Sequence, residues 1–254
     1  MGKSELMLRG ILGHPYLDLN SYVDLTSFDK LHSEICRAFV LGKNFAGNGS
    51  LQLEKYDQEN VNLDAYDGDI SPVWLMYEKY LKLSNDDPIK VAGEGLNEEQ
   101  LILYIKYAFG AYNPWHIYNV FDKIDGKRVL SPIHHLFPNL ITWIDNLDIF
   151  SNVTRAYFLL IEQDGISVEH CDPSPHPDIP REFIHIKSCD SRPFYVREYK
   201  NSEKIYMNSR VTYFNDQDWH GGEASKKTTY SLRIDGIFTE TFRKQLKDKA
   251  NAIQ

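Results

Sequence analysis

The sequence is poor in cysteine. Its three cysteines, Cys36, Cys171 and Cys189, lie far apart and form no Cys-x-x-Cys pair. This spacing argues against a disulfide framework and against a cysteine-ligated zinc site. We therefore expect reduced thiols and a cytoplasmic location.

Long apolar runs and basic clusters are also missing. No stretch approaches about 18 consecutive apolar residues, and the N-terminal MGKSELMLRG has no apolar core, so we expect neither a membrane helix nor a signal peptide. The net charge is -8, with 21 acidic and 13 basic side chains in residues 1–150 and 15 of each in residues 151–254. Nucleic-acid and membrane-surface partners require clustered lysine and arginine, so we expect neither. The oligomeric state is left open.

Helical patterns dominate the chain before residue 137. A first helix is predicted with Thr26 or Ser27 as its N-cap. Residues 73–83 and 97–109 show further apolar stripes at helical spacing. We therefore expect residues 1–136 to form a helical or mixed extension that packs on a core domain.

From residue 137 onward the chain shows short extended runs rich in β-branched and aromatic residues. They cover residues 157–161, 166–172, 181–187, 194–199, 205–207 and 210–214. Repeated short strands of this kind favour a sandwich or barrel. A short helix is expected from Pro138, and Thr239 is expected to cap a final helix that runs to about Ala252. The predicted class is mainly β with helices (α+β), with residues 137–254 as the core.

The first candidate site is His170-x-Asp172. Side chains alternate along a strand, so these two point the same way, about 6.6 Å apart, and can bind one metal ion. Chance gives roughly 0.7 such pairs in a chain of this composition, and His176-x-Asp178 is a second one. Four prolines within residues 173–180 force an irregular loop around the second pair. We therefore prefer the first.

A third ligand and a cation are expected beside this pair. The segment from His220 to Arg233 has its midpoint in the polar run 223–229, so a symmetrical hairpin would set Arg233 directly across from His220. Two histidines and one carboxylate form the facial triad of non-haem Fe(II) oxygenases, which leaves three coordination positions open. The Arg233 guanidinium would bind one carboxylate of a five-carbon keto-diacid whose other end chelates the iron.

Together these residues resemble a known family. His170-x-Asp172, His220 fifty residues later and Arg233 within TYSLRIDG are similar to the Fe(II)/2-oxoglutarate-dependent oxygenases, which have a double-stranded β-helix (jelly-roll, cupin-like) core. The resemblance is closest to the aspartyl/asparaginyl β-hydroxylase-like branch, where stretches similar to FPNLITWIDNLDIF and REFIHI flank the first metal motif. It spans about residues 137–238 and implies Fe(II), 2-oxoglutarate and O2.

The resemblance also implies a role for each residue. His170, Asp172 and His220 would bind the iron, and Arg233 with Ser231 would hold the distal carboxylate of 2-oxoglutarate. The reaction would hydroxylate a substrate C–H bond and release succinate and CO2. Related halogenases lack the carboxylate ligand, so Asp172 indicates hydroxylation. The substrate class stays open between a small molecule and an amino-acid or protein side chain.

Two positions depart from the family pattern. Many members carry a serine two residues after the arginine, where this chain has Asp235, and the serine two residues before the arginine is expected to substitute for it. The branch often shows Arg-x-His on the next strand, whereas Arg181 and His185 are four residues apart. Arg197 and Trp219 are further candidates for the pocket.

Two rival interpretations remain. A different metal enzyme on a cupin-like barrel would bind Zn or Mn at the same side chains without using 2-oxoglutarate, and Arg233 would then be structural. A non-catalytic jelly-roll binding module would bind no stoichiometric metal. The adjacent His134 and His135, and the aromatic segment 112–118, are interpreted as packing rather than as functional groups.

Overall fold

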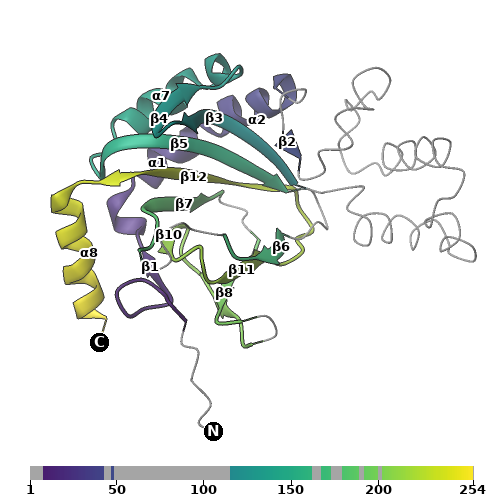
Figure 1. The fold of residues 1–254 in the computed structure, drawn as a ribbon. Helices are drawn as coiled ribbons and strands as arrows, with labels where there is room; N and C mark the ends of the chain where they lie inside the picture. Colours follow the sequence, from purple (N-terminus) through teal and green to yellow (C-terminus); the bar gives the residue numbers. More distant parts are fainter. Residues whose placement is uncertain are drawn as a thin grey trace, which may run out of the picture. The chain divides into compact units, whose positions relative to one another are not determined.

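The structure is a computed structural model that describes residues 8–42, 47–48, 115–161, 167–172, 179–188, 192–199 and 202–253 (Figure 1). The chain forms one compact unit from residues 1–45 and 117–254 and a second from residues 46–116, to which β2 (Gly47–Asn48) belongs. The expected boundary near residue 136 stays a prediction. The helices expected at 73–83 and 97–109 lie outside the described residues.

The larger sheet of the first unit is built around strand β12 (Figure 1). Its strands follow the order β1 (Tyr16–Asp18), β10 (Val211–Phe214), β7 (Phe183–Lys187), β12 (Thr229–Phe238), β5 (Phe150–Ile161) and β3 (Trp115–Ile124), and β4 (Lys127–Leu130) pairs with β3. The pairs from β1 to β5 are antiparallel. Strands from the N-terminal part of the chain therefore extend the sheet of the core.

A second, smaller antiparallel sheet faces part of the first. Its order is β6 (Ser167–His170), β11 (Trp219–Gly222), β8 (Phe194–Arg197) and β9 (Ile205–Tyr206). From β5 to β12 the chain passes back and forth between the two sheets, which is the jelly-roll arrangement of two four-stranded layers. The mainly β fold agrees with the expected class, and the short strands lie close to the predicted runs.

The predicted hairpin from His220 to Arg233 is wrong. His220 lies on β11 in the smaller sheet, whereas Arg233 lies on β12 in the larger one. The polar run between them crosses from one sheet to the other instead of turning back within a sheet. The two residues thus approach the same interior from opposite walls.

The two faces of β12 differ sharply in polarity. Tyr230, Leu232 and Ile234 are buried on one face, where the Tyr230 ring lies 5.6 Å from Phe39 of α2 and 5.7 Å from Phe158 of β5. The residues between them are polar and point between the two sheets, because side chains alternate along a strand. Strand β12 therefore presents an apolar outer face and a polar inner face.

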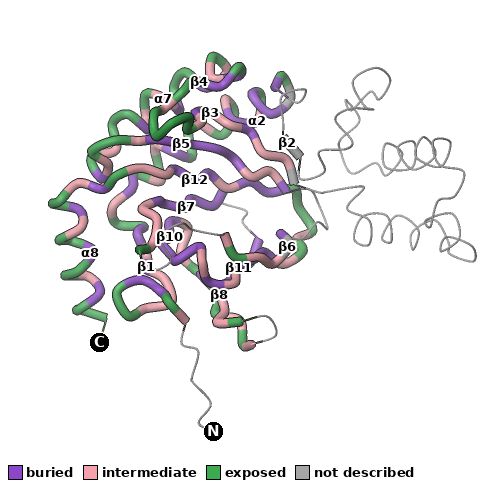
Figure 2. The backbone as a smooth tube through the Cα atoms, viewed as in Figure 1, coloured by how far each residue is buried: buried purple, intermediate pink, exposed green. Residues whose placement is uncertain are grey.

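Helices cover the apolar outer face (Figure 1). They are α1 (Leu25–Lys30), α2 (His32–Leu41) and α7 (Pro138–Asp145), with short 3-10 turns η1 (Asn20–Tyr22) and η4 (His134–Leu136), and α8 (Glu240–Ala252) follows β12. Figure 2 shows that these helices bury one stripe and expose the other. None of the helices in the described ranges is both long enough and apolar enough to cross a membrane.

Two helix caps were predicted, and one is confirmed. The Thr239 hydroxyl accepts a hydrogen bond from the Phe242 N–H at 3.1 Å and starts α8, as expected. The expected cap of α1 at Thr26 or Ser27 is wrong, because the Asp24 carboxylate accepts the Ser27 N–H at 3.0 Å instead. A carboxylate at the N-cap also interacts favourably with the helix dipole.

An apolar cluster joins the two sheets at one end of the barrel. Phe183 of β7, Val196 of β8 and Phe214 of β10 are buried together with Met207. Burial of such side chains contributes about 25 cal/mol per Å² of apolar surface. This cluster holds the walls of the barrel together without filling its polar part.

The stability of the first unit is expected to depend on pH through Asp29. Arg210 donates hydrogen bonds to Asp29 at 2.9 and 2.6 Å, and these bonds lower the pKa of that carboxyl below its ordinary value of 3.8. The ion pair therefore stabilises the folded state above about pH 4 and loses its effect as the pH falls through the lowered pKa. Urea unfolding of the wild type and Asp29→Asn should differ at pH 7 and converge near pH 2. A difference that is independent of pH would contradict this.

Candidate metal centre

His170, Asp172 and His220 come together between the two sheets. His170 at the end of β6 is the cross-strand partner of His220 on β11, and their ring centroids lie 4.3 Å apart. Asp172 follows two residues after His170 and places Oδ1 3.6 Å from His170 Nε2. The nitrogen and oxygen atoms that these three residues offer all lie within 4.8 Å of one another. The structure thus assembles the three residues that the sequence singled out.

The site is open on one side only. The side chains of His170 and Asp172 are 38% and 30% exposed, whereas His220 is 4% exposed. The rings of Phe214 and Phe194 lie 5.3 and 6.1 Å from the His220 ring and cover its inner side. A small molecule or a side chain therefore has access from the side of His170 and Asp172.

The tautomer of His220 follows from its hydrogen bond. Its Nδ1 lies 2.9 Å from the backbone carbonyl of Asp218, and a carbonyl can only accept, so Nδ1 carries the proton and Nε2 keeps its lone pair. Burial, together with the neighbouring His170, lowers the pKa of His220 to about 4. The imidazole is neutral at pH 7, which is the form that binds metal ions.

The N-terminal segment binds Asp218, whose backbone carbonyl accepts the hydrogen bond from His220. The backbone N–H groups of Arg9 and Gly10 donate to the Asp218 carboxylate at 2.9 and 2.8 Å. Gly10 has φ +57°, and a Cβ there would lie 2.3 Å from the His14 carbonyl oxygen, so the turn requires glycine. No sequence pattern predicts this contact with Asp218, because it joins residues more than 200 positions apart.

The second oxygen of Asp172 faces two arginines. Asp172 Oδ2 lies 3.3 Å from Arg233 Nη1 and 3.7 Å from Arg181 Nη2. Arg233 also donates to Asp216 at 2.6 Å and to Asp235 at 2.9 Å. Asp216 is fully buried, and its backbone oxygen accepts the Asp172 N–H at 2.8 Å. This network of two arginines and three carboxylates holds Asp172 in place.

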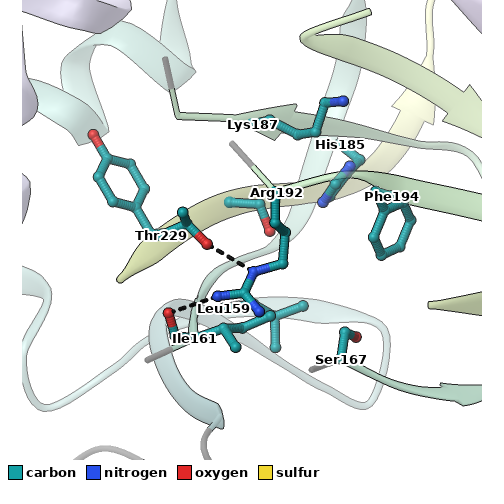
Figure 3. Close-up of a pocket in the computed structure, with 10 residues that line it drawn as sticks. Leu159, Ile161, Ser167, His185, Lys187, Arg192, Phe194 and Thr229 are labelled. Carbon is teal, nitrogen blue, oxygen red and sulfur yellow. Dashed lines mark hydrogen bonds between the residues drawn. The ribbon is translucent and has the colours of Figure 1, made fainter. Parts of the chain in front are cut away.

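A cavity of about 20 Å³ lies between the two sheets (Figure 3). Its lining includes Ser167, His185, Lys187, Arg192, Thr229 and Ser231. Ser231, expected from the sequence as a co-substrate contact, therefore faces this cavity. Lys187 and Arg192 were missed, because nothing in the sequence shows that these charged residues are buried. The interior of the barrel is strongly basic on this side.

Gly222 makes room for Arg192 in the barrel. A Cβ on Gly222 would lie 3.1 Å from Arg192 Cδ. With that space open, Arg192 donates to Thr229 Oγ1 at 2.8 Å and to the Ile161 carbonyl at 3.0 Å (Figure 3). It also donates to the Glu223 carbonyl at 3.2 Å. These bonds fix the guanidinium at the wall of the cavity.

Two further candidates lie outside the barrel interior. Arg197 and Trp219 are cross-strand partners on β8 and β11, and they face away from the barrel because His220, next to Trp219, faces inward. Arg197 forms an ion pair with Glu169 and donates to the Ser202 carbonyl. These two residues therefore do not line the cavity between the sheets, and a contact with the substrate stays a prediction.

The other candidate metal ligands either pack locally or lie outside the described residues. His134 Nδ1 bonds to the Ser131 carbonyl at 2.7 Å, and its ring packs against His135. The rejected pair His176 and Asp178 lies outside the described residues. The triad thus has no competitor among the described His, Cys, Asp and Glu residues as a group of three that can hold a metal ion.

The donor set suits a divalent metal ion of the first transition series. It offers two imidazole nitrogens and one carboxylate, a combination that binds Fe(II) with positions left for other ligands. The His220 tautomer and the arginine contacts of Asp172 are the kind of outer hydrogen bonds that orient metal ligands. The residues present therefore fit a metal centre.

Comparison with known proteins finds similar solved structures at low sequence identity. No family model matches the chain, and no curated protein matches it either. One similar solved structure is an oxidoreductase of the 2OG-Fe(II) oxygenase family from Burkholderia pseudomallei, with 12% identity over 48% of this chain and 68% of that chain and a TM-score of 0.33. A second is a prolyl hydroxylase in complex with a hypoxia inducible factor oxygen degradation domain peptide fragment from Trichoplax adhaerens, with 9% identity, coverages of 53% and 66% and a TM-score of 0.32. A third is a prolyl-4-hydroxylase from Pseudomonas putida, with 12% identity, coverages of 52% and 78% and a TM-score of 0.30. The assignment of function therefore rests on the residues of the site.

Proposed function

We propose that this chain is an Fe(II)- and 2-oxoglutarate-dependent dioxygenase that hydroxylates a C–H bond of its substrate and releases succinate and CO2. The observation that carries the proposal is the meeting of His170, Asp172 and His220 with all their ligand atoms within 4.8 Å. They sit between the two sheets of a jelly roll, with one side open to solvent. Two imidazoles and one carboxylate leave coordination positions for a bidentate co-substrate and O2.

The protein prepares these ligands before any metal binds. His220 presents the lone pair of Nε2 because Nδ1–H is held by the Asp218 carbonyl at 2.9 Å. Asp172 presents Oδ1 toward His170 because Oδ2 is held by Arg233 and Arg181. Fe(II) bound by these residues would supply the redox chemistry that activates O2 together with 2-oxoglutarate.

The substrate is proposed to approach from the exposed side of His170 and Asp172. The opposite side is closed by Phe194, Phe214 and the basic interior. The resemblance of residues 137–238 to the aspartyl/asparaginyl β-hydroxylase-like branch makes aspartate and asparagine side chains, free or in peptides, the first substrates to test. Small metabolites follow in the same screen.

The expected contact of Arg233 with the distal carboxylate of 2-oxoglutarate stays a prediction. Arg233 lies at the site, 3.3 Å from Asp172. Its guanidinium, however, already contacts the carboxylates of Asp172, Asp216 and Asp235. Ser231, its proposed helper, faces the cavity.

Anaerobic titration of the Fe(II)-loaded protein with 2-oxoglutarate tests the proposal. We expect the visible metal-to-ligand charge-transfer band of the chelated co-substrate, lost in His170→Ala and retained in His135→Ala, which removes an exposed imidazole. Bound metal without the band would overturn the proposal in favour of a metal enzyme that does not use 2-oxoglutarate. No bound metal would favour a binding module. If the band is observed, the candidate substrates are then compared by the rate of succinate release that each one supports under air.

A further inference from the structure

Lys187 is a buried cation without a compensating anion. It lies on β7, is 6% exposed, and donates to the Met207 carbonyl at 2.6 Å. In the part of the chain that the structure describes, no carboxylate forms an ion pair with it. Burial lowers the pKa of Lys187, since an isolated ammonium group is costly in a protein interior. A buried charge of this kind is stabilised by an anion that binds next to it.

The groups around Lys187 are hydrogen-bond donors. Ser231 is its cross-strand neighbour on β12, and both line the cavity. Thr229 Oγ1 accepts from Arg192 at 2.8 Å, which leaves its own hydroxyl proton to donate. The cavity is therefore lined by two hydroxyls and by Lys187, whose Nζ donates to the Met207 carbonyl and points away from Thr229 (Figure 3).

His185 adds an unpartnered group to the same wall. It is 5% exposed and lines the cavity, and its Nδ1 has no hydrogen-bond partner among the described residues. Burial, with the charges of Lys187 and Arg233, lowers its pKa to about 3, so the ring is neutral. Buried polar atoms in native proteins almost always have a partner, so this atom also points to a bound polar ligand.

The cavity lies next to Arg233 along β12. On β12 the inward-facing positions are Arg233, Ser231 and Thr229, and Arg233 contacts Asp172. Alternate residues on a strand are about 6.6 Å apart, so Ser231 and its partner Lys187 lie one such step along the strands from Arg233. A short acid that chelates a metal at the triad with one end could therefore place a carboxylate at its other end near Ser231 and Lys187.

We infer that Lys187, with Ser231 and Thr229, holds the distal carboxylate of 2-oxoglutarate, and that Arg233 positions Asp172 instead of binding the co-substrate. The inference rests on the proposed function, and it changes the expected cationic partner of the acid from Arg233 on β12 to Lys187 on β7. The 20 Å³ cavity holds about one water molecule, so the carboxylate displaces solvent and the flexible Lys187 side chain moves to meet it. Arg233 remains engaged by Asp216 and Asp235.

Calorimetric titration measures how much the distal carboxylate contributes to co-substrate binding. The protein is loaded with Mn(II), which is expected to bind the acids without supporting turnover. 2-Oxoglutarate is compared with 2-oxopentanoate, which keeps the chelating end and replaces the distal carboxylate by a methyl group. We expect the wild type to prefer 2-oxoglutarate by at least about 10-fold, since a charge-assisted hydrogen bond is lost with the carboxylate. Lys187→Met is expected to abolish most of this preference, and Ser231→Ala to reduce it about 3-fold.

The matched control is Lys127→Met, which removes an exposed lysine on β4 and should leave the preference unchanged. A full preference for 2-oxoglutarate in both Lys187→Met and Ser231→Ala would overturn the inference, as would a wild type that binds both acids equally. Loss of the preference in Arg233→Lys alone would restore Arg233 as the ligand. Wild-type protein that binds Mn(II) but neither acid would instead refute the proposed function. Urea midpoints of each variant establish that it is folded.

Discussion

His220→Ala is expected to lower the affinity of the protein for Mn(II) or Fe(II) by more than about 100-fold. Loss of a partner outside the coordination shell already costs about 10- to 100-fold, and His220 is a proposed ligand. It is also the most rigid of the three, because its ring is 4% exposed and fixed by the Asp218 carbonyl. Titration followed by the electron paramagnetic resonance signal of free Mn(II) measures the change.

The control for this substitution is His135→Ala, which removes an exposed imidazole from η4. It should bind Mn(II) as the wild type does. Comparable metal affinity of His220→Ala and the wild type would show that His170, Asp172 and His220 are a hydrogen-bonded cluster rather than a metal centre. Circular dichroism of both variants establishes that the loss is not caused by unfolding.

Arg233→Met is expected to lower the free energy of unfolding of the metal-free protein by about 3–5 kcal/mol, the usual cost of removing one partner of a buried ion pair. The Arg233 side chain is 8% exposed and Asp216 is fully buried. Without the guanidinium, the carboxylates of Asp216, Asp235 and Asp172 would face one another with only Arg181 nearby. Urea unfolding at pH 7 measures the loss.

Two further variants define the cause of this loss. Arg37→Met removes an exposed arginine from α2 and should change stability by less than about 0.5 kcal/mol. Arg233→Lys keeps the charge but not the planar fork that reaches several carboxylates, so its stability should fall between those of the wild type and Arg233→Met. A loss below about 1 kcal/mol in Arg233→Met would contradict a structural role for Arg233.

Local patterns were enough to predict several strands after residue 150 and the last helix, but not β3 and β4. Runs of β-branched and aromatic residues coincide with β7, β8 and β10, and the Thr239 cap coincides with the start of α8. These features depend on neighbours in sequence. The pair His170 and Asp172 could be singled out for the same reason, since two residues on one strand share a face.

Long-range pairing could not be predicted in the same way. A polar run between two extended segments looks like a hairpin turn whether the chain turns back or crosses to another sheet, so His220 and Arg233 were placed on neighbouring strands. Burial of charge was equally hidden. Asp216 and Lys187 look like ordinary surface residues in the sequence, and only the tertiary structure encloses them. These enclosed charges are the basis of the inference that Arg233 positions Asp172.

The alternation along β12 has a consequence for how this protein can change. Even-numbered positions such as Tyr230 and Leu232 belong to the apolar core, while odd-numbered positions such as Ser231 and Arg233 belong to the site. Substitutions at the first kind act on folding. Of the second kind, Ser231 lines the cavity and acts on ligand choice, whereas Arg233 also supports folding through its ion pairs. A mutant library restricted to the cavity-lining positions Lys187, Thr229 and Ser231 should therefore yield folded proteins with altered acid preference, and new specificity becomes accessible without rebuilding the scaffold.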